Sequence, residues 1–167
     1  SKNITWSNVF YVVGDHNLIP KFQRSADLKE KPHELYVPAI TVKIQFNNQE
    51  YFITNTHFTV TEKGESANYS FEQATKLVTY LQKYQEMIIC GDFNSPRGGD
   101  VFYYFCKFYK DNIPNKYKTS LDKNLHRVKN LKFMVDVLFS TKSYIIKNVK
   151  LVDGVSDHLA VVAEISL

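Results

Sequence analysis

The run Met-Ile-Ile-Cys-Gly at positions 87–91 restricts the fold more than any other part of the sequence. It contains no charged residue and no alternation of polar and apolar positions, which is typical of a strand buried on both faces. The segment that leads into this run begins at Ser70 and carries apolar side chains at helical spacing. Ser70 and Gln73 have the spacing of a capping box. A helix that leads into a doubly buried strand predicts an α+β or a layered α/β/α fold.

The regions on either side of this unit predict further strands and one more helix. Apolar residues alternate over 40–46, Asn47 and Asn48 form a turn, and an extended pattern resumes at 50–57, which indicates a hairpin with His57 near a strand end. An aromatic helix is expected from Val101 with Asp100 as its cap. Three more strand-like runs close the chain, at 133–140, 144–152 and 159–167.

Length and composition favour a single domain that spans residues 1–167. The chain is 44% hydrophobic and has no linker-like segment. Its apolar runs are far shorter than the roughly 18 to 20 residues of a membrane helix, so no membrane span is expected. We take a monomer and a reducing, cytoplasmic setting as defaults. The net charge of +4 permits a phosphate-bearing partner, and lysines gather between 107 and 132.

Polar side chains follow or interrupt several of the predicted strands. Charged groups beside buried strands cost several kcal/mol unless they are paired or bind a metal, so we expect these residues to meet on one rim of the fold. They are His57, Asp92, Asn94, Asp136, Asp157 and His158.

This set of side chains suits the hydrolysis of a phosphate ester. Two histidines can act as general acid and base, and a neighbouring carboxylate would fix the tautomer of each. Aspartates can hold Mg²⁺ through oxygen, while Asn94 offers an uncharged donor to a phosphate oxygen. The alternative for Asp92 and Asn94 is that they only turn the chain at a strand exit.

Four short motifs carry a resemblance to a known family. Thr-His-Phe at 56–58, Gly-Asp-Phe-Asn at 91–94, Met-Val-Asp-Val-Leu-Phe-Ser-Thr at 134–141 and Ser-Asp-His at 156–158 occur in this order. In order and spacing they resemble the endonuclease/exonuclease/phosphatase (DNase I-like) superfamily. The resemblance implies a four-layer α/β sandwich of two packed mixed β-sheets flanked by helices. It also implies hydrolysis of phosphodiesters or phosphomonoesters with a divalent metal, Mg²⁺ or Mn²⁺.

The resemblance also implies roles for individual residues. His158 would assist the attack on phosphorus and be oriented by Asp136. Asp92 and Asn94 would handle the nucleophilic water and the phosphoryl oxygens, and together with Asp157 they would form the metal site.

Two further residues match side chains of DNase-like members. His57 matches a histidine that DNase-like and sphingomyelinase-like members use as an acid or a phosphate ligand. Glu34 resembles a carboxylate that pairs with that histidine in some DNase-like members.

One part of the family pattern has no counterpart in this sequence. Family members open with an Asn-bearing strand and, after a helix, a strand that ends in Gln-Glu, whose glutamate is the principal metal ligand. Residues 3–8 only superficially resemble the first of these strands, and Gln49-Glu50 opens a hairpin strand instead. We therefore expect residues 14–22 to belong to the middle of the fold, and the chain to begin after the glutamate and to be N-terminally truncated.

The motifs and the missing Gln-Glu segment together leave two possible functions of different classes. The first is a metal-dependent hydrolase of phosphate esters, with nucleic acid favoured as substrate by the lysines. The second is an inactive, truncated phosphoesterase-like module that binds nucleic acid or a protein partner through the basic and aromatic segment 101–132.

Overall fold

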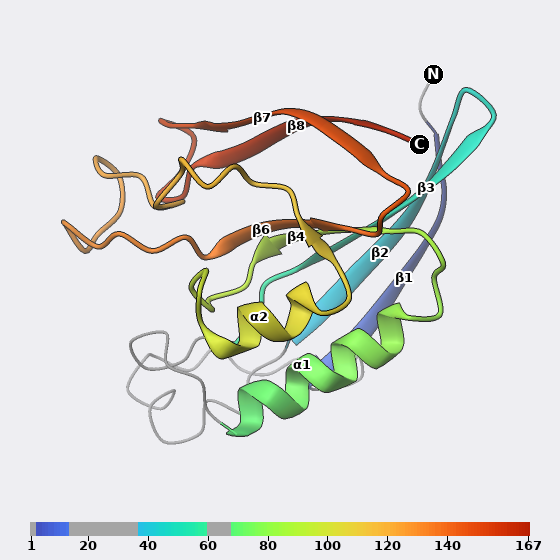
Figure 1. Cartoon of the computed structure of the whole chain (residues 1–167), viewed down its shortest axis with the longest axis horizontal. Coiled ribbons are helices and arrows are strands. Elements are labelled where there is room, and N and C mark those ends of the chain that lie inside the picture. The colour runs from blue at the N-terminus through green and yellow to red at the C-terminus, as the bar shows by residue number, and fades with distance from the viewer. Residues whose placement is uncertain (1–2, 14–36, 60–67) are drawn as a thin grey trace.

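Two β-sheets and two helices make up the described part of the chain (Figure 1). The computed structural model describes residues 3–13, 37–59 and 68–167. The larger sheet has the strand order β1-β2-β3-β4-β6-β5, and the smaller sheet pairs β7 with β8. The strands are β1 (Asn3–Val13), β2 (Val37–Phe46), β3 (Gln49–Thr56), β4 (Ile88–Asp92), β5 (Lys110–Asp111), β6 (Asp136–Ser140), β7 (Ile145–Val152) and β8 (Ala160–Ser166).

The predicted hairpin is confirmed. Strands β2 and β3 pair antiparallel, with Phe46 opposite Gln49. Asn47 and Asn48 have φ angles of 51° and 59°, the left-handed conformation that asparagine tolerates better than most residues and that a tight hairpin turn requires.

Strand β4 is buried on both faces, as its sequence predicts. It lies between β3, to which it is parallel, and β6, to which it is antiparallel. Ile89 packs into the cluster formed with the helices, whereas its neighbour Ile88 packs into the cluster formed with β7 and β8. Alternate side chains of one strand therefore hold two different layers in place.

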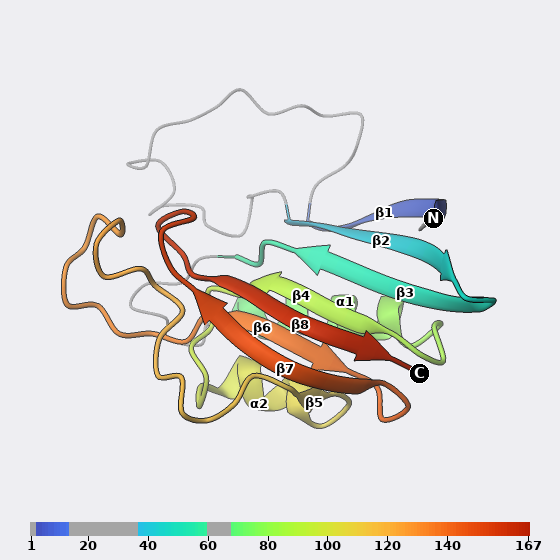
Figure 2. The same ribbon diagram turned by 90° about the horizontal axis from the view of Figure 1, so that it is seen from above.

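The layers follow from these two clusters (Figures 1 and 2). Helices α1 (Asn68–Leu81) and α2 (Asp100–Cys106) cover one face of the larger sheet, and the β7–β8 sheet covers part of the other. The predicted fold class, an α/β arrangement of two packed sheets with flanking helices, is confirmed. None of the helices in the described part is long and apolar enough to cross a membrane.

Element boundaries differ from the prediction at several places, and three of these differences have an identifiable local cause. Helix α1 begins at Asn68, so Ser70 lies inside its first turn, and the buried Gln73 side chain accepts a hydrogen bond from the Thr59 hydroxyl instead of closing a capping box. The cap of α2 is Gly99, and Asp100 is the first helical residue. Strand β6 begins at Asp136, because residues 133–135 bond to loops instead of a strand.

Several other expectations concern the N-terminal third. Glu34 and residues 14–22 lie outside the described residues. The segment 3–8 belongs to β1, an edge strand antiparallel to β2. Glu50 lies at the turn end of the hairpin, where its carboxylate accepts a hydrogen bond from Lys43 at 2.9 Å. Gln49-Glu50 thus opens β3, as predicted.

Gly91 is required by the close approach of β4 to the end of β3. Its φ angle is +133°, and a Cβ atom at this position would lie 1.9 Å from the carbonyl oxygen of Thr56. Both the backbone conformation and the lack of space exclude a side chain. This contact sets the spacing between the strand ends that carry His57 and Asp92.

We expect Gly91→Ala to lower the free energy of unfolding by about 3 kcal/mol, because it combines backbone strain with overpacking. Gly154→Ala is the matched control, since Gly154 has a φ angle of +76° but open space around it, and it should cost about 1 kcal/mol. Urea denaturation measures both. Equal losses for the two variants would show that the contact with Thr56 contributes nothing.

Candidate active site

The candidate site lies at one end of the larger sheet, where three neighbouring strands deliver polar residues. His57 follows β3, Asp92 is the last residue of β4, and Asp136 is the first residue of β6. Because β6 runs antiparallel to β4, Asp136 pairs directly with Asp92 across the sheet. His158 reaches the same rim from the segment before β8, where it forms an isolated bridge with Leu121.

Buried phenylalanines fix the chain next to these polar residues. Phe58 and Phe93 are 1% and 0% exposed and stack with their ring centroids 5.7 Å apart. The Phe58 amide donates to the Asp92 carbonyl at 2.7 Å. Because neighbouring side chains of an extended chain point in opposite directions, burial of the two rings directs His57 and Asp92 toward the rim.

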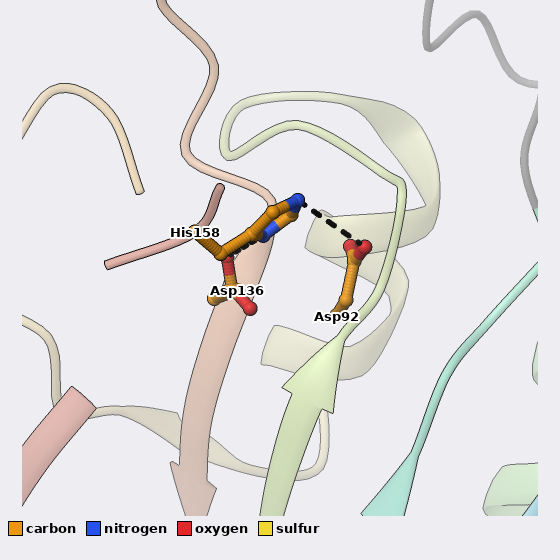
Figure 3. A group of neighbouring side chains, drawn as sticks. All are labelled: Asp92, Asp136 and His158. Atoms are coloured by element: carbon orange, nitrogen blue, oxygen red, sulfur yellow. Dashed lines mark hydrogen bonds and ion pairs between the residues drawn. The ribbon is translucent and has the colours of Figure 1, made fainter. Parts of the chain in front are cut away.

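Asp92 lies between two histidines. Its Oδ2 is 3.5 Å from Nε2 of His57 and 3.8 Å from Nε2 of His158, and Figure 3 shows the second of these pairs. These separations exceed a hydrogen bond and leave Oδ2 accessible to another partner. The other oxygen, Oδ1, accepts the backbone N–H of Asn94 at 2.8 Å.

Burial raises the pKa of the Asp92 carboxyl above its ordinary value. The N–H of Asn94 opposes this shift, the negative charge of Asp136 adds to it, and the two histidines oppose it. The rim is therefore a place where negative charge is destabilised unless a cation is near.

His158 is held by a short hydrogen bond to Asp136 (Figure 3). Its Nδ1 lies 2.7 Å from Asp136 Oδ2. Burial acts against the charged imidazolium, but this hydrogen bond and the charges of Asp136, Asp92 and Asp157 outweigh it and raise the pKa of His158. With Nδ1 occupied by the carboxylate, Nε2 is directed toward Asp92 and the open side of the rim.

Asn94 and Asp157 are placed differently from the other predicted residues. Asn94 has a φ angle of 48° and donates its side-chain N–H to the Phe58 carbonyl at 2.8 Å, so it shapes the strand exit. None of the described residues bonds to its second amide hydrogen or to its Oδ1. Asp157 is exposed, and its side chain makes no hydrogen bond with the described residues, although its charge acts on His158. The structure does not test the catalytic and metal-binding roles of these residues, which stay predictions.

A metal ion has one candidate position among the described residues. Asp92, Asp136 and His158 each offer a ligand atom, and these atoms lie within 4.8 Å of one another. Asp136 Oδ2 is already paired with His158, but none of the described residues donates a hydrogen bond to Asp136 Oδ1 or Asp92 Oδ2. Two available carboxylate oxygens fit a hard divalent cation completed by water.

Two residues that the sequence interpretation missed connect the rim to the long segment before β6. Ser120 accepts the backbone N–H groups of Val135 and Asp136 at 3.1 Å each. The buried Asp122 accepts the N–H groups of Asn124, Leu125 and Gly154, which lowers its pKa. Asp122-Lys-Asn repeats the Asp-x-Asn pattern of Asp92-Phe-Asn, and this repetition was the available signal.

No family model and no curated protein matches the sequence, but solved structures share the fold. An endonuclease/exonuclease/phosphatase from Bacteroides vulgatus superposes with a TM-score of 0.72 at 17% identity, over 99% of this chain and 66% of that chain. A mannosyl-6-phosphatase from Bacteroides thetaiotaomicron gives 0.69 at 14% identity, over 99% and 67%. The catalytic domain of human Nocturnin gives 0.67 at 16% identity, over 99% and 59%.

These matches confirm the predicted architecture. The chain has the fold of the endonuclease/exonuclease/phosphatase, DNase I-like, superfamily, which includes phosphatases and nucleases. It spans between 59% and 67% of the length of these three structures.

Proposed function

We propose that the chain is a hydrolase of phosphate esters that works with a divalent metal ion. The observation that carries the proposal is the position of Asp92 between His57 and His158, with His158 tied to Asp136 at 2.7 Å. A carboxylate between two imidazoles, at the end of a buried strand, combines a metal ligand with groups that accept and donate protons.

Each side chain has a separate task in this proposal. Asp136 holds His158 in one tautomer, so that Nε2 can move a proton to or from the attacking water or hold a phosphoryl oxygen. His57, whose side chain is 72% exposed, protonates the leaving oxygen on the other side of Asp92. The free amide hydrogen of Asn94 binds a non-bridging oxygen.

Mg²⁺ or Mn²⁺ fits the open oxygens described above. Oδ2 of Asp92 and Oδ1 of Asp136 would hold the ion, with water in the remaining positions, while Oδ2 of Asp136 would orient His158. Asn94 and Asp157 stay as the further ligands that the family resemblance implies. When bound, the ion polarises the phosphoryl group and neutralises its charge. Its positive charge would also offset the electrostatic repulsion between the neighbouring carboxylates of Asp92 and Asp136.

Hydrolysis of bis-p-nitrophenyl phosphate and of p-nitrophenyl phosphate tests the proposal. We expect release of nitrophenolate in the presence of Mg²⁺ or Mn²⁺, and its loss on addition of EDTA. Comparison of the diester with the monoester separates a phosphodiesterase from a phosphatase. Turnover unaffected by EDTA would contradict the role of the metal.

The alternative is a binding module without activity. Its support is the segment between β5 and β6, where residues 112–135 contain six lysines and arginines but only one acidic residue, the internally bonded Asp122. In this segment and α2, Phe102 and Phe105 are buried, whereas Tyr103 is 58% exposed. A folded chain that binds nucleic acid but hydrolyses neither ester would favour this alternative.

A further inference from the structure

A basic pocket opens beside the candidate site, on the side of β6. It has a volume of about 240 Å³ and is lined by Arg97, Lys118 and Lys132 together with uncharged residues. No carboxylate lines it. Lys118 and Lys132 are exposed, and neither forms an ion pair or a hydrogen bond with the residues that the structure describes.

Arg97 joins the walls of this pocket. Its guanidinium pairs with Asp111 at 2.8 Å and donates to the carbonyl oxygens of Ile113 and Tyr117. Its backbone N–H donates to the carbonyl oxygen of Met134 at 2.8 Å. The segments that carry Lys118 and Lys132 are therefore held against each other, and both lysines line the same pocket.

Arg97 also brings positive charge to the pocket. Its Nε is one of two buried side-chain polar atoms without a hydrogen-bond partner in the described part of the chain. This atom is shielded from the surface, so Arg97 contributes its positive charge to the pocket and not a free donor, and Asp111 offsets part of that charge. Two lysines beside the arginine, with no carboxylate among the residues that line the pocket, suit a phosphate group.

The pocket is close to the candidate site. Met134, which lines the pocket, is two residues before Asp136, and Pro96, which also lines it, is two residues after Asn94. Two residues of chain span at most about 7 Å. A substrate with its reacting phosphate at Asp92 can thus reach the pocket with another phosphate of the same molecule.

We propose that this pocket, formed around Arg97, Lys118 and Lys132, binds a second phosphate of the substrate, and that the substrate is a single strand of nucleic acid. The inference rests on the proposed function, because the first phosphate is the one to be hydrolysed. It explains why the basic residues concentrate in the segment before β6. A substrate with a single phosphate would leave the pocket unused.

Binding of a fluorescein-labelled hexathymidylate, followed by fluorescence anisotropy in EDTA, tests the inference without turnover. The variant Lys118→Gln/Lys132→Gln should raise Kd by about tenfold. It should also reduce the slope of log Kd against log salt by about 0.7, since the pocket holds one phosphate and each phosphate contact on a single strand contributes about 0.7.

The matched control is Lys147→Gln/Lys150→Gln. It removes the same charge from exposed positions on β7, and neither lysine forms an ion pair or hydrogen bond within the described residues. Its Kd should stay within about twofold of the wild type, because salt screens distant charges. Equal weakening by both double variants, or no measurable binding by the wild type, would overturn the pocket assignment.

The two proposals fail separately in these experiments. Pocket-dependent binding without hydrolysis of the small diester would leave the pocket in place and refute the proposed function. Hydrolysis of the small diester with oligonucleotide binding that ignores Lys118 and Lys132 would refute the pocket alone.

Discussion

His158→Ala should lower kcat for metal-dependent hydrolysis of bis-p-nitrophenyl phosphate by about 10²- to 10⁴-fold, the range for loss of a positioned acid or base. The expectation follows from the geometry of the ring. Nδ1 is bonded to Asp136 at 2.7 Å, so the only ring nitrogen that remains for the substrate is Nε2, on the side of Asp92. His126 does not replace it, because its ring centroid is 6.3 Å away and it bonds to Val128 through Nδ1.

The variant should remain folded, since the His158 side chain is partly exposed, and circular dichroism should match the wild type. Added imidazole should restore part of the lost rate by occupying the vacated space. His126→Ala is the control at the same rim and should retain most of the activity. Unchanged turnover in His158→Ala would remove this residue from the mechanism.

Asp136→Asn should reduce kcat by on the order of 10²-fold while leaving KM for the small diester nearly unchanged. An amide in place of the carboxylate can stabilise the wrong imidazole tautomer, and it removes the charge that favours the imidazolium form. Ser120 bonds to the backbone of Asp136 and not to its side chain, so the strand start should be preserved. A rise in KM with kcat unchanged would instead indicate a role in binding.

A titration of His158 by NMR in EDTA gives a second measurement on Asp136→Asn. The wild-type pKa is raised by the hydrogen bond and charge of Asp136, against the effect of burial, so the variant pKa should fall. A histidine whose pKa is raised by folding stabilises the fold at pH values below its pKa in the unfolded chain, which is about 6.5. That stability is lost as pH rises through the folded pKa. The variant should therefore be destabilised most below about pH 6.5. An unchanged pKa would contradict the pairing.

The part of the site that the sequence predicts well is the part built by local strand patterns. His57, Asp92 and Asp136 meet because alternate residues of β3, β4 and β6 are anchored by buried neighbours such as Phe93. Apolar periodicity in the sequence is sufficient to predict each of these strand ends.

Other features depend on contacts between distant segments. The role of Arg97 as the link between residues 111–117 and Met134 arises from a loop whose path no periodic pattern records. The capping box at Ser70 failed because Gln73 bonds to Thr59, a residue that the helix meets only in the folded chain. At Gln73 a tertiary partner overrode a local rule, whereas at Arg97 no local rule applied.

Asp92 is the central residue of the proposed active site. Its role is tested most directly by measuring the rate of bis-p-nitrophenyl phosphate hydrolysis as a function of Mg²⁺ concentration for the wild type and for Asp92→Ala. We expect a saturable rise in rate for the wild type and no rise for the variant, because the carboxylate that would hold the ion is gone. The same Mg²⁺ dependence in both proteins would contradict the assignment of this rim as the active site.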